Sequence, residues 1–467
     1  MNSLPTCLAL LGWSLAVLAE TRDPFPKPIE VEQDVIVVGI EEFSTLPDIG
    51  GAPAQMRTVI VEPGSGQLLV GDMAGIIYRI DEEGSATPYL DMADAKWGVA
   101  IDASWREEGL ESFAFHPQFA QRATPGYGKF YTWLDSTNTQ KAADFSTDSD
   151  APSHHLLLVE WTAKAVDADQ YDGGAPRELI RLEQPFRNHN GGAIAFNPVA
   201  KPSDADFGKL YVGVGDGGSG GDPLKLGQDM GSAFGKILRI DPLGDNGRNG
   251  EYGIPRDNPF VGQAGALPEI YAYGLRNPQQ FAWDGDSGDM MTSDIGQGTV
   301  EEVSLVAAGD NLGWSDWEGS FRYLSAIGVD ADDVRSDADV RYPFVEYDHT
   351  DSLFIRSVAV TGLQVVRGDA IPELQDLILF GELALGELFY VDADNRPNGG
   401  QAAIRRVLFD DGSGEPKTLL QLVQEKYVAR EKEPPLRTDM RVGAGPSGEI
   451  YLINKYDGIV RRLLSMQ

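Results

Sequence analysis

The chain has 467 residues, and its 42% hydrophobic and 24% charged residues are typical of a folded globular protein rather than a disordered one. Its 72 Asp and Glu residues against 38 Lys and Arg residues give a formal net charge of −34, which excludes nucleic acid as a partner because phosphate backbones are repelled. The single cysteine, Cys7, excludes an internal disulfide and a metal site built from several cysteines.

The first predicted element is a secretory signal peptide over residues 1–19. Its apolar run from Cys7 to Ala19 is too short to span a bilayer, and Val17-Leu18-Ala19 supplies the small-residue end of a cleavage site. We therefore expect a periplasmic or secreted protein, and no second apolar stretch predicts a membrane span. The segment lacks the usual Lys or Arg before its apolar run, so an apolar N-terminus of a cytosolic protein is the alternative.

From Arg57 onward the chain repeats a pair of short strands joined by a polar turn. Apolar residues alternate with polar ones, and Gly, Pro, Asp and Asn stand at the breaks, as in β-hairpins. The six predicted strand pairs are 57–63 with 66–70, 113–117 with 128–132, 193–198 with 208–213, 281–284 with 290–293, 362–366 with 377–381, and 442–446 with 448–453. The repeats predict an all-β fold, a six-bladed β-propeller with four-stranded antiparallel blades and long inter-strand loops, as one domain over residues 30–467.

The densest polar cluster is Arg-Asn-His-Asn-Gly-Gly at 187–192, directly before the third repeat. His189 in this loop can titrate near neutral pH, as a general base requires, although a structural histidine is the alternative. Asp216 follows one hairpin later, and a carboxylate there can fix the tautomer of the imidazole by a hydrogen bond. The same Asp-Gly sequence is also ordinary turn chemistry.

Two further clusters follow along the chain. Arg276, in the segment 271–278, offers a planar charged donor that suits an anionic cofactor or a quinone oxygen gaining charge, or else a bridge between two acidic loops. The segment 294–303 joins a Gly-rich turn to paired carboxylates. Backbone carbonyls with carboxylates suit calcium, and a solvated acidic turn is the alternative.

These clusters, in this order, resemble the soluble aldose sugar dehydrogenases of the glucose/sorbosone type, which use pyrroloquinoline quinone (PQQ) and calcium on a six-bladed propeller. The resemblance covers residues 108–314 and fades to the generic blade pattern beyond Tyr323. It is carried by the motifs at 108–110, 114–117, 189–192, 215–218, 235–241, 274–278 and 309–314.

The resemblance implies an oxidoreductase that oxidises aldoses at the anomeric carbon to lactones and passes electrons to a quinone or cytochrome. It implies a histidine base held by a carboxylate, an arginine that stabilises charge on the quinone oxygen, a calcium ion on the cofactor, and a second, structural calcium ion. The residues that match are His189, Asp216 and Arg276 for catalysis; His189, Arg276, Asn277, Arg437 and Arg441 for the cofactor; and Gly296, Gln297 (carbonyls) and Glu302 for calcium.

The sequence departs from the family at its cationic positions. A lysine that pairs with the cofactor carboxylates should lie in the segment 381–386, around Ala384, and none is present there. Arg437 and Arg441 are candidates to substitute, with a shifted spacing. The departure leaves two other functions open: a calcium-dependent, lactonase-like propeller hydrolase in which His189 activates water, and a non-catalytic propeller that binds carbohydrate or protein.

Overall fold

The computed structural model describes residues 23–466 except 148, 150–151, 326–327 and 355–357. The predicted signal peptide therefore lies outside the described residues. Strands make up most of the regular structure, and the α-helix α1 (Leu419–Ala429) begins at a capping box between Thr418 and Gln421. In the part of the chain that is described, no helix has the length and apolar composition needed to cross a membrane.

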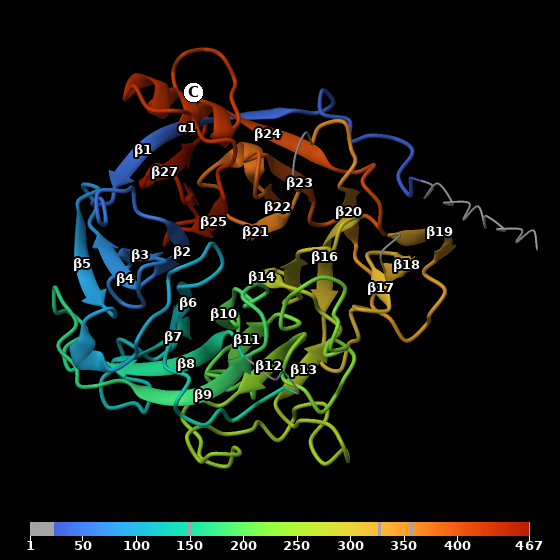
Figure 1. Ribbon diagram of the computed structural model, residues 1–467. Helices are drawn as coiled ribbons and strands as arrows, with labels where there is room; N and C mark the ends of the chain where they lie inside the picture. The colour runs from blue at the N-terminus through green and yellow to red at the C-terminus, as the bar shows by residue number, and fades with distance from the viewer. Residues whose placement is uncertain (1–22, 148, 150–151, 326–327, 355–357, 467) are drawn as a thin grey trace, which may run out of the picture.

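Four sheets have four strands, one has eight and one has three (Figure 1). The four-stranded sheets are β2 (Met56–Val61), β3 (Leu68–Asp72), β4 (Ile76–Ile80) and β5 (Ala86–Asp91); β6 (Leu110–Phe115), β7 (Lys129–Ser136), β8 (His154–Thr162) and β9 (Arg177–Gln184); β10 (Ile194–Phe196), β11 (Leu210–Val214), β12 (Lys236–Ile240) and β13 (Ile270–Tyr273); and β14 (Pro278–Trp283), β15 (Met290–Asp294), β16 (Val300–Val306) and β20 (Val345–Asp348).

The larger sheet joins two sets of strands. In spatial order it consists of β21 (Val360–Val366), β22 (Leu377–Glu382), β23 (Leu388–Asp392), β24 (Arg405–Asp410), β1 (Ile36–Thr45), β27 (Ile459–Leu464), β26 (Ile450–Ile453) and β25 (Arg441–Ala444). The three-stranded sheet consists of β17 (Trp317–Glu318), β18 (Phe321–Tyr323) and β19 (Val329–Val334).

The sheets are arranged in a ring, as in a β-propeller (Figure 1). The first strands of successive sets contact one another around the centre, in the closed order β2, β6, β10, β14, β21, β25 and back to β2. Buried hydrophobic clusters fill the space between neighbouring sets. One of them packs β26 and β27 against the sheet of β2 to β5. Each of the six predicted strand pairs forms an antiparallel pair, which confirms the repeat.

The N-terminal strand β1 links the end of the chain to its beginning. It pairs antiparallel with β27, with Ile40 opposite Leu463, and thus adds a fourth strand to β25, β26 and β27. It also pairs in parallel with β24, with Val38 opposite Phe409, which merges the last two sets into one sheet. Because this sheet merges two sets, the number of six blades stays a prediction. The structure shows a ring of mostly antiparallel sheets.

Many inner strands are buried on both faces, which differs from the predicted alternation of apolar and polar residues. All positions of β3, β6, β11 and β15 are buried. The reason is that a sheet in the ring packs against a neighbour on each side, so neither face meets water. Each fully buried Leu, Ile or Phe contributes about 1.5–3 kcal/mol to stability.

The ring also decides where long loops meet. Because the strands of an antiparallel set alternate in direction, the loop that enters its first strand and the loop between its second and third strands lie at the same end. The loops that precede β10 and β14 and those that follow β11, β15 and β26 therefore meet at one mouth of the ring. The polar clusters of the sequence lie in these loops.

Candidate functional site

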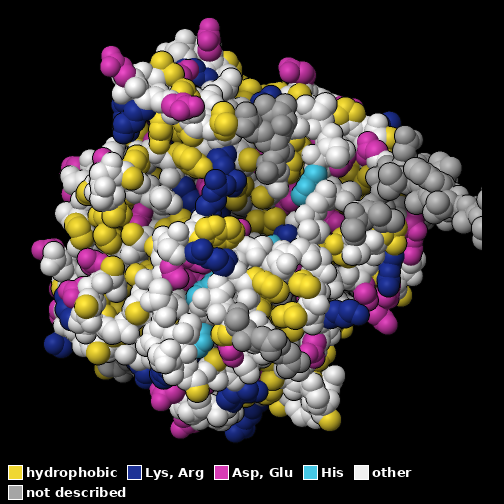
Figure 2. Space-filling view, viewed as in Figure 1, with side chains coloured by type: hydrophobic (Ala, Val, Ile, Leu, Met, Phe, Trp, Pro, Cys, Tyr) yellow, Lys and Arg dark blue, Asp and Glu magenta, His cyan; other side chains and the backbone are white. Residues whose placement is uncertain are grey.

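A pocket of about 480 Å³ opens at this mouth of the ring. Figure 2 shows Lys, Arg and His side chains gathered near the centre of the face, although the chain as a whole is strongly acidic. The pocket is lined by residues far apart in the sequence, including Arg57, Glu107, His189, Arg276 and Lys455. Segments from opposite ends of the chain thus build one site.

His189 projects from the loop before β10 and is hydrogen bonded at one ring nitrogen. Its Nδ1 lies 2.7 Å from Oδ1 of Asp216, and its backbone N–H donates to Oε2 of Glu107 at 3.0 Å. The His189 backbone has a φ of 58°. Two residues later, Gly191 has no room for a side chain, because a Cβ would lie 2.1 Å from the Gly213 carbonyl oxygen. Because Asp216 accepts the proton of Nδ1, the described contacts leave Nε2 free for a ligand in the pocket.

Asp216 is fully buried and held by several donors. Its Oδ1 accepts the N–H of Gly218 at 2.9 Å, its Oδ2 accepts Nε1 of Trp314 at 2.8 Å, and its own N–H donates to the carbonyl of Arg276 at 2.8 Å. Burial alone would raise the pKa of Asp216, but His189 and Arg276 hold it below its ordinary value. Asp216 therefore stays ionised and can fix the tautomer of His189.

If His189 is the general base that the sequence predicts, replacing Trp314 by Phe should lower kcat/KM about 10-fold and move the acidic limb of its pH profile to higher pH. The variant loses the donor to Oδ2 of Asp216, so more of the carboxylate charge stabilises the imidazolium form of His189, which cannot act as a base. The measurement is kcat/KM against pH. Trp317→Phe is the matched control, because the buried Nε1 of Trp317 has no hydrogen-bond partner in the described structure. An unshifted limb in Trp314→Phe would contradict the assignment.

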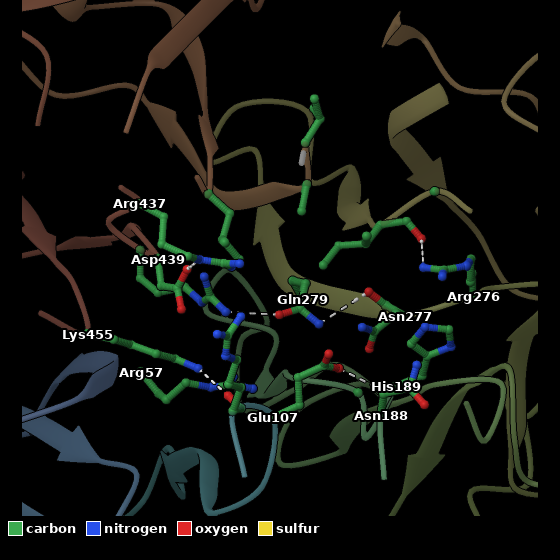
Figure 3. A pocket seen from close by; sticks show the side chains of 18 of the residues that line it. Arg57, Glu107, Asn188, His189, Arg276, Asn277, Gln279, Arg437, Asp439 and Lys455 are labelled. Carbon is green, nitrogen blue, oxygen red and sulfur yellow. Dashed lines mark hydrogen bonds and ion pairs between the residues drawn. The ribbon is translucent and has the colours of Figure 1, made fainter. Parts of the chain in front are cut away.

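Arg276 and Asn277 lie beside His189 (Figure 3), where β14 begins. Their backbone N–H groups donate to the two carboxylate oxygens of Asp294, at 2.9 and 2.6 Å, and burial raises the pKa of Asp294 to about 7. The Arg276 guanidinium donates to the Ile295 carbonyl at 2.9 Å and to Oε1 of Gln297 at 3.1 Å. Over the described residues Arg276 forms no ion pair, so it does not bridge two acidic loops, and Oδ1 of Asn277 is buried without a partner. Both side chains line the pocket.

The wall opposite His189 is cationic. Arg57, Arg437, Arg441 and Lys455 line it, and Figure 3 shows Arg57, Arg437 and Lys455 across the pocket from His189 and Arg276. Arg57 forms an ion pair with Glu111, and Arg437 forms one with Asp439.

Two of these four cations lack a counterion. Neither Arg441 nor Lys455 has a carboxylate within ion-pair distance in the described ranges. Burial lowers the pKa of Arg441 to about 9 and that of Lys455 well below its ordinary value, and the nearby Arg57 guanidinium adds to both effects. An uncompensated buried charge costs several kcal/mol, and this cost applies to Arg441, which is buried, more than to the half-buried Lys455. A bound anion would offset this cost, so the wall fits a ligand that carries carboxylates.

The predicted calcium ligands are split between two places. Gly296 and Gln297 line the pocket, and within the described segments neither carbonyl accepts a hydrogen bond. Glu302 is buried in β16 and is not part of the pocket lining. Burial and the nearby Asp294 and Glu346 carboxylates raise its pKa well above the ordinary value, and its Oε2 has no partner in the residues described. Among all the residues that the structure describes, no three or more His, Cys, Asp or Glu side chains are grouped so that they could hold a metal ion.

The sequence reasoning missed several pocket residues. Arg57 was read as part of a strand, and Glu107, Lys455 and His349 were not singled out. His349 lines the pocket with Nε2 2.6 Å from Oε1 of Glu301, which holds the pKa of His349 above its ordinary value in spite of burial. One feature of the sequence could have identified Lys455. It follows the second strand of the sixth repeat, which is the position that Asp216 occupies in the third repeat.

Comparison with known proteins identifies a family to which the sequence of this chain is similar. Residues 56–461 match the family model described as Glucose / Sorbosone dehydrogenase. The HIPL1 protein of Arabidopsis thaliana is 28% identical over 71% of this chain and 50% of its own length. The Hedgehog-interacting protein of Mus musculus is 30% identical over 47% of this chain and 29% of its own length. The chain thus spans half or less of the length of these two relatives.

A solved structure of similar fold is the PQQ-bound form of the aldose sugar dehydrogenase from Streptomyces coelicolor. It is 21% identical in sequence, with a TM-score of 0.58 over 91% of this chain and 98% of that chain. At this level of identity the likeness concerns the fold, and it supports the propeller architecture.

Proposed function

Because the chain belongs to the glucose/sorbosone dehydrogenase family, we propose that it oxidises aldose sugars at the anomeric carbon to lactones, with PQQ and calcium as cofactors. The observation that carries the proposal is the His189–Asp216 pair, which faces a pocket beside Arg276 and opposite a cationic wall. A base, its carboxylate support and an unpaired guanidinium are what proton removal coupled to charge transfer needs.

In the proposed reaction, Nε2 of His189 accepts the proton of the anomeric hydroxyl. Asp216 holds the imidazole by Nδ1 and stabilises the positive charge that it acquires. Arg276 is fixed by the Ile295 carbonyl and by Gln297, so its charge is in place before negative charge develops on the acceptor. These groups need no rearrangement when the proton moves, which is the advantage of a rigid site.

The residues present fit PQQ and calcium. PQQ would supply the two-electron acceptor, and its carboxylates suit Arg437 and the counterion-free Arg441, with Asn277 beside them. The free carbonyls of Gly296 and Gln297 suit a calcium ion at the cofactor, while Glu302 suits a second, structural ion outside the pocket. The proposal includes six blades, with β1 completing the set of β25, β26 and β27.

Reconstitution tests the proposal. Purified protein freed of cofactor and metal should reduce an artificial electron acceptor with an aldose only after PQQ and calcium are both added. Removing calcium with a chelator should abolish turnover, and adding it back should restore it. Absence of both PQQ binding and acceptor reduction over a panel of aldoses would reject the dehydrogenase.

A second candidate is a propeller that binds carbohydrate or protein without catalysis. The similarity to the Hedgehog-interacting protein, whose name describes an interaction, favours it. A lactonase-like hydrolase is the third candidate. Hydrolysis of a lactone by the same purified protein without added quinone would distinguish it from the dehydrogenase. The dehydrogenase proposal further places the protein in the periplasm or outside the cell, with a quinone or cytochrome as the natural electron acceptor.

A further inference from the structure

Lys455 lines the same pocket as the segment 381–386, where the sequence lacks its expected lysine. Its backbone N–H donates to the Thr438 carbonyl at 3.1 Å, and the Thr438 N–H donates to the Ala384 carbonyl at 2.9 Å. The backbone at Thr438 thus lies between the turn after β26 and the segment 381–386, and Leu383 of that segment lines the same pocket as Lys455. A lysine supplied from the neighbouring set of strands can thus stand in for one missing in this segment.

The described contacts of Lys455 include no ion-pair partner. Its Nζ donates to the Arg106 carbonyl at 2.7 Å and makes no ion pair with any described residue. The two acidic side chains of this wall are engaged elsewhere, Glu107 with the His189 N–H and Asp439 with Arg437. Arg441 likewise has no ion-pair partner among the described residues, because its guanidinium donates to the Met440 carbonyl and to Oε1 of Gln279.

We propose that Lys455 and Arg441 form a subsite for a carboxylate group of the bound ligand, across the pocket from His189. The ligand class is a rigid molecule with a carboxylate at one end and its reacting group at the other, and under the proposed function this is PQQ. A uronic acid, which is a sugar that carries a carboxylate, is the other source of the same chemistry.

Binding of PQQ to the cofactor-free full chain tests the subsite without any turnover. Lys455→Met should weaken the Kd measured by titration calorimetry about 10–100-fold, because a charge-assisted contact is lost. Lys455→Arg should retain most of the affinity. Lys426→Met is the matched control, since Lys426 lies on α1 and pairs with Glu42 at an exposed position. An unchanged Kd in Lys455→Met, or an equal loss in the Lys426→Met control, overturns the subsite.

Thermal unfolding separates ligand binding from a merely structural role. In the cofactor-free state, Lys455→Met should have the same Tm as the wild type or a higher one, because methionine removes the cost of desolvating an ammonium group beside the Arg57 guanidinium. The rise in Tm on adding PQQ should shrink. A lower Tm of the cofactor-free variant with an undiminished PQQ-induced rise would mean that Lys455 serves the fold.

Two further measurements separate PQQ from the sugar as the source of the carboxylate, and the subsite from the proposed dehydrogenase function. If Lys455→Met raises the KM for glucuronate but not for glucose and leaves the PQQ Kd unchanged, the PQQ assignment is overturned and the carboxylate belongs to the substrate. If the wild type binds PQQ in a Lys455-dependent way but oxidises no aldose, the proposed function fails and the subsite stands.

Discussion

His189→Asn should lower kcat for aldose oxidation by about 10²–10⁴-fold, the usual effect of removing a positioned general base. Nε2 of His189 is the ring nitrogen left free by the 2.7 Å contact between Nδ1 and Asp216. Asparagine is chosen because the residue has a φ of 58°, a backbone conformation that Asn adopts more readily than most residues. The loss should appear in kcat at saturating PQQ, calcium and sugar.

The histidine control is His155→Asn. His155 lies on β8 against Arg181, outside the pocket, so its replacement should leave kcat within a few-fold of the wild type. Thermal unfolding of both variants shows whether the fold is kept. A His189→Asn enzyme that retains a tenth or more of the wild-type kcat would remove His189 from the role of base.

Arg276→Met should lower kcat about 10²–10³-fold, with a smaller effect on PQQ binding. Its guanidinium is held by two fixed acceptors, the Ile295 carbonyl and Gln297, and has no carboxylate partner over the described segments, so its charge is available to the reacting group. Arg276→Lys should recover only part of the rate, because an ammonium cannot reproduce the planar donor geometry. The measurement is kcat beside the PQQ Kd for each variant.

Arg341→Met is the matched control for Arg276. Arg341 is an exposed arginine that pairs with Asp310 on the surface, and its loss should change kcat little. Equal losses in both arginine variants, or a loss in Arg276→Met confined to the PQQ Kd, would contradict a role for Arg276 in stabilising developing charge.

The strand pairs and much of the candidate site were predictable from the sequence. Alternating apolar residues and Gly, Pro, Asp or Asn turns act over a few neighbours, so hairpins such as β10 with β11 are encoded locally. His189, Asp216 and Arg276 stood out because each lies in a polar cluster beside such a hairpin. The ring brings loops of separate sets to one mouth, so His189 and Arg276 line one pocket and Asp216 lies behind it, hydrogen bonded to His189.

The charge balance of the pocket was not predictable. The absence of a lysine in 381–386 argued against a cationic cofactor site, yet the structure has Arg57 and Lys455 in the same wall as Arg437 and Arg441. Glu302, predicted for a second, structural calcium ion, lies outside the pocket that Gly296 and Gln297 line, and its calcium role stays a prediction. Sequence proximity in an antiparallel strand does not say which face or end of the sheet a side chain occupies in the ring.

The sequence by itself determined the strands, their pairing with the next strand and the residues able to act as base, support and charge stabiliser, because these depend on short-range pattern and residue chemistry. Ring closure decided the rest. It brings Glu107 to His189 over 82 residues, Trp314 to Asp216 over 98 and the Arg106 carbonyl to Lys455 over 349. Such contacts arise only when separate sets of strands pack around the ring, and no local pattern records which loops will then face one another.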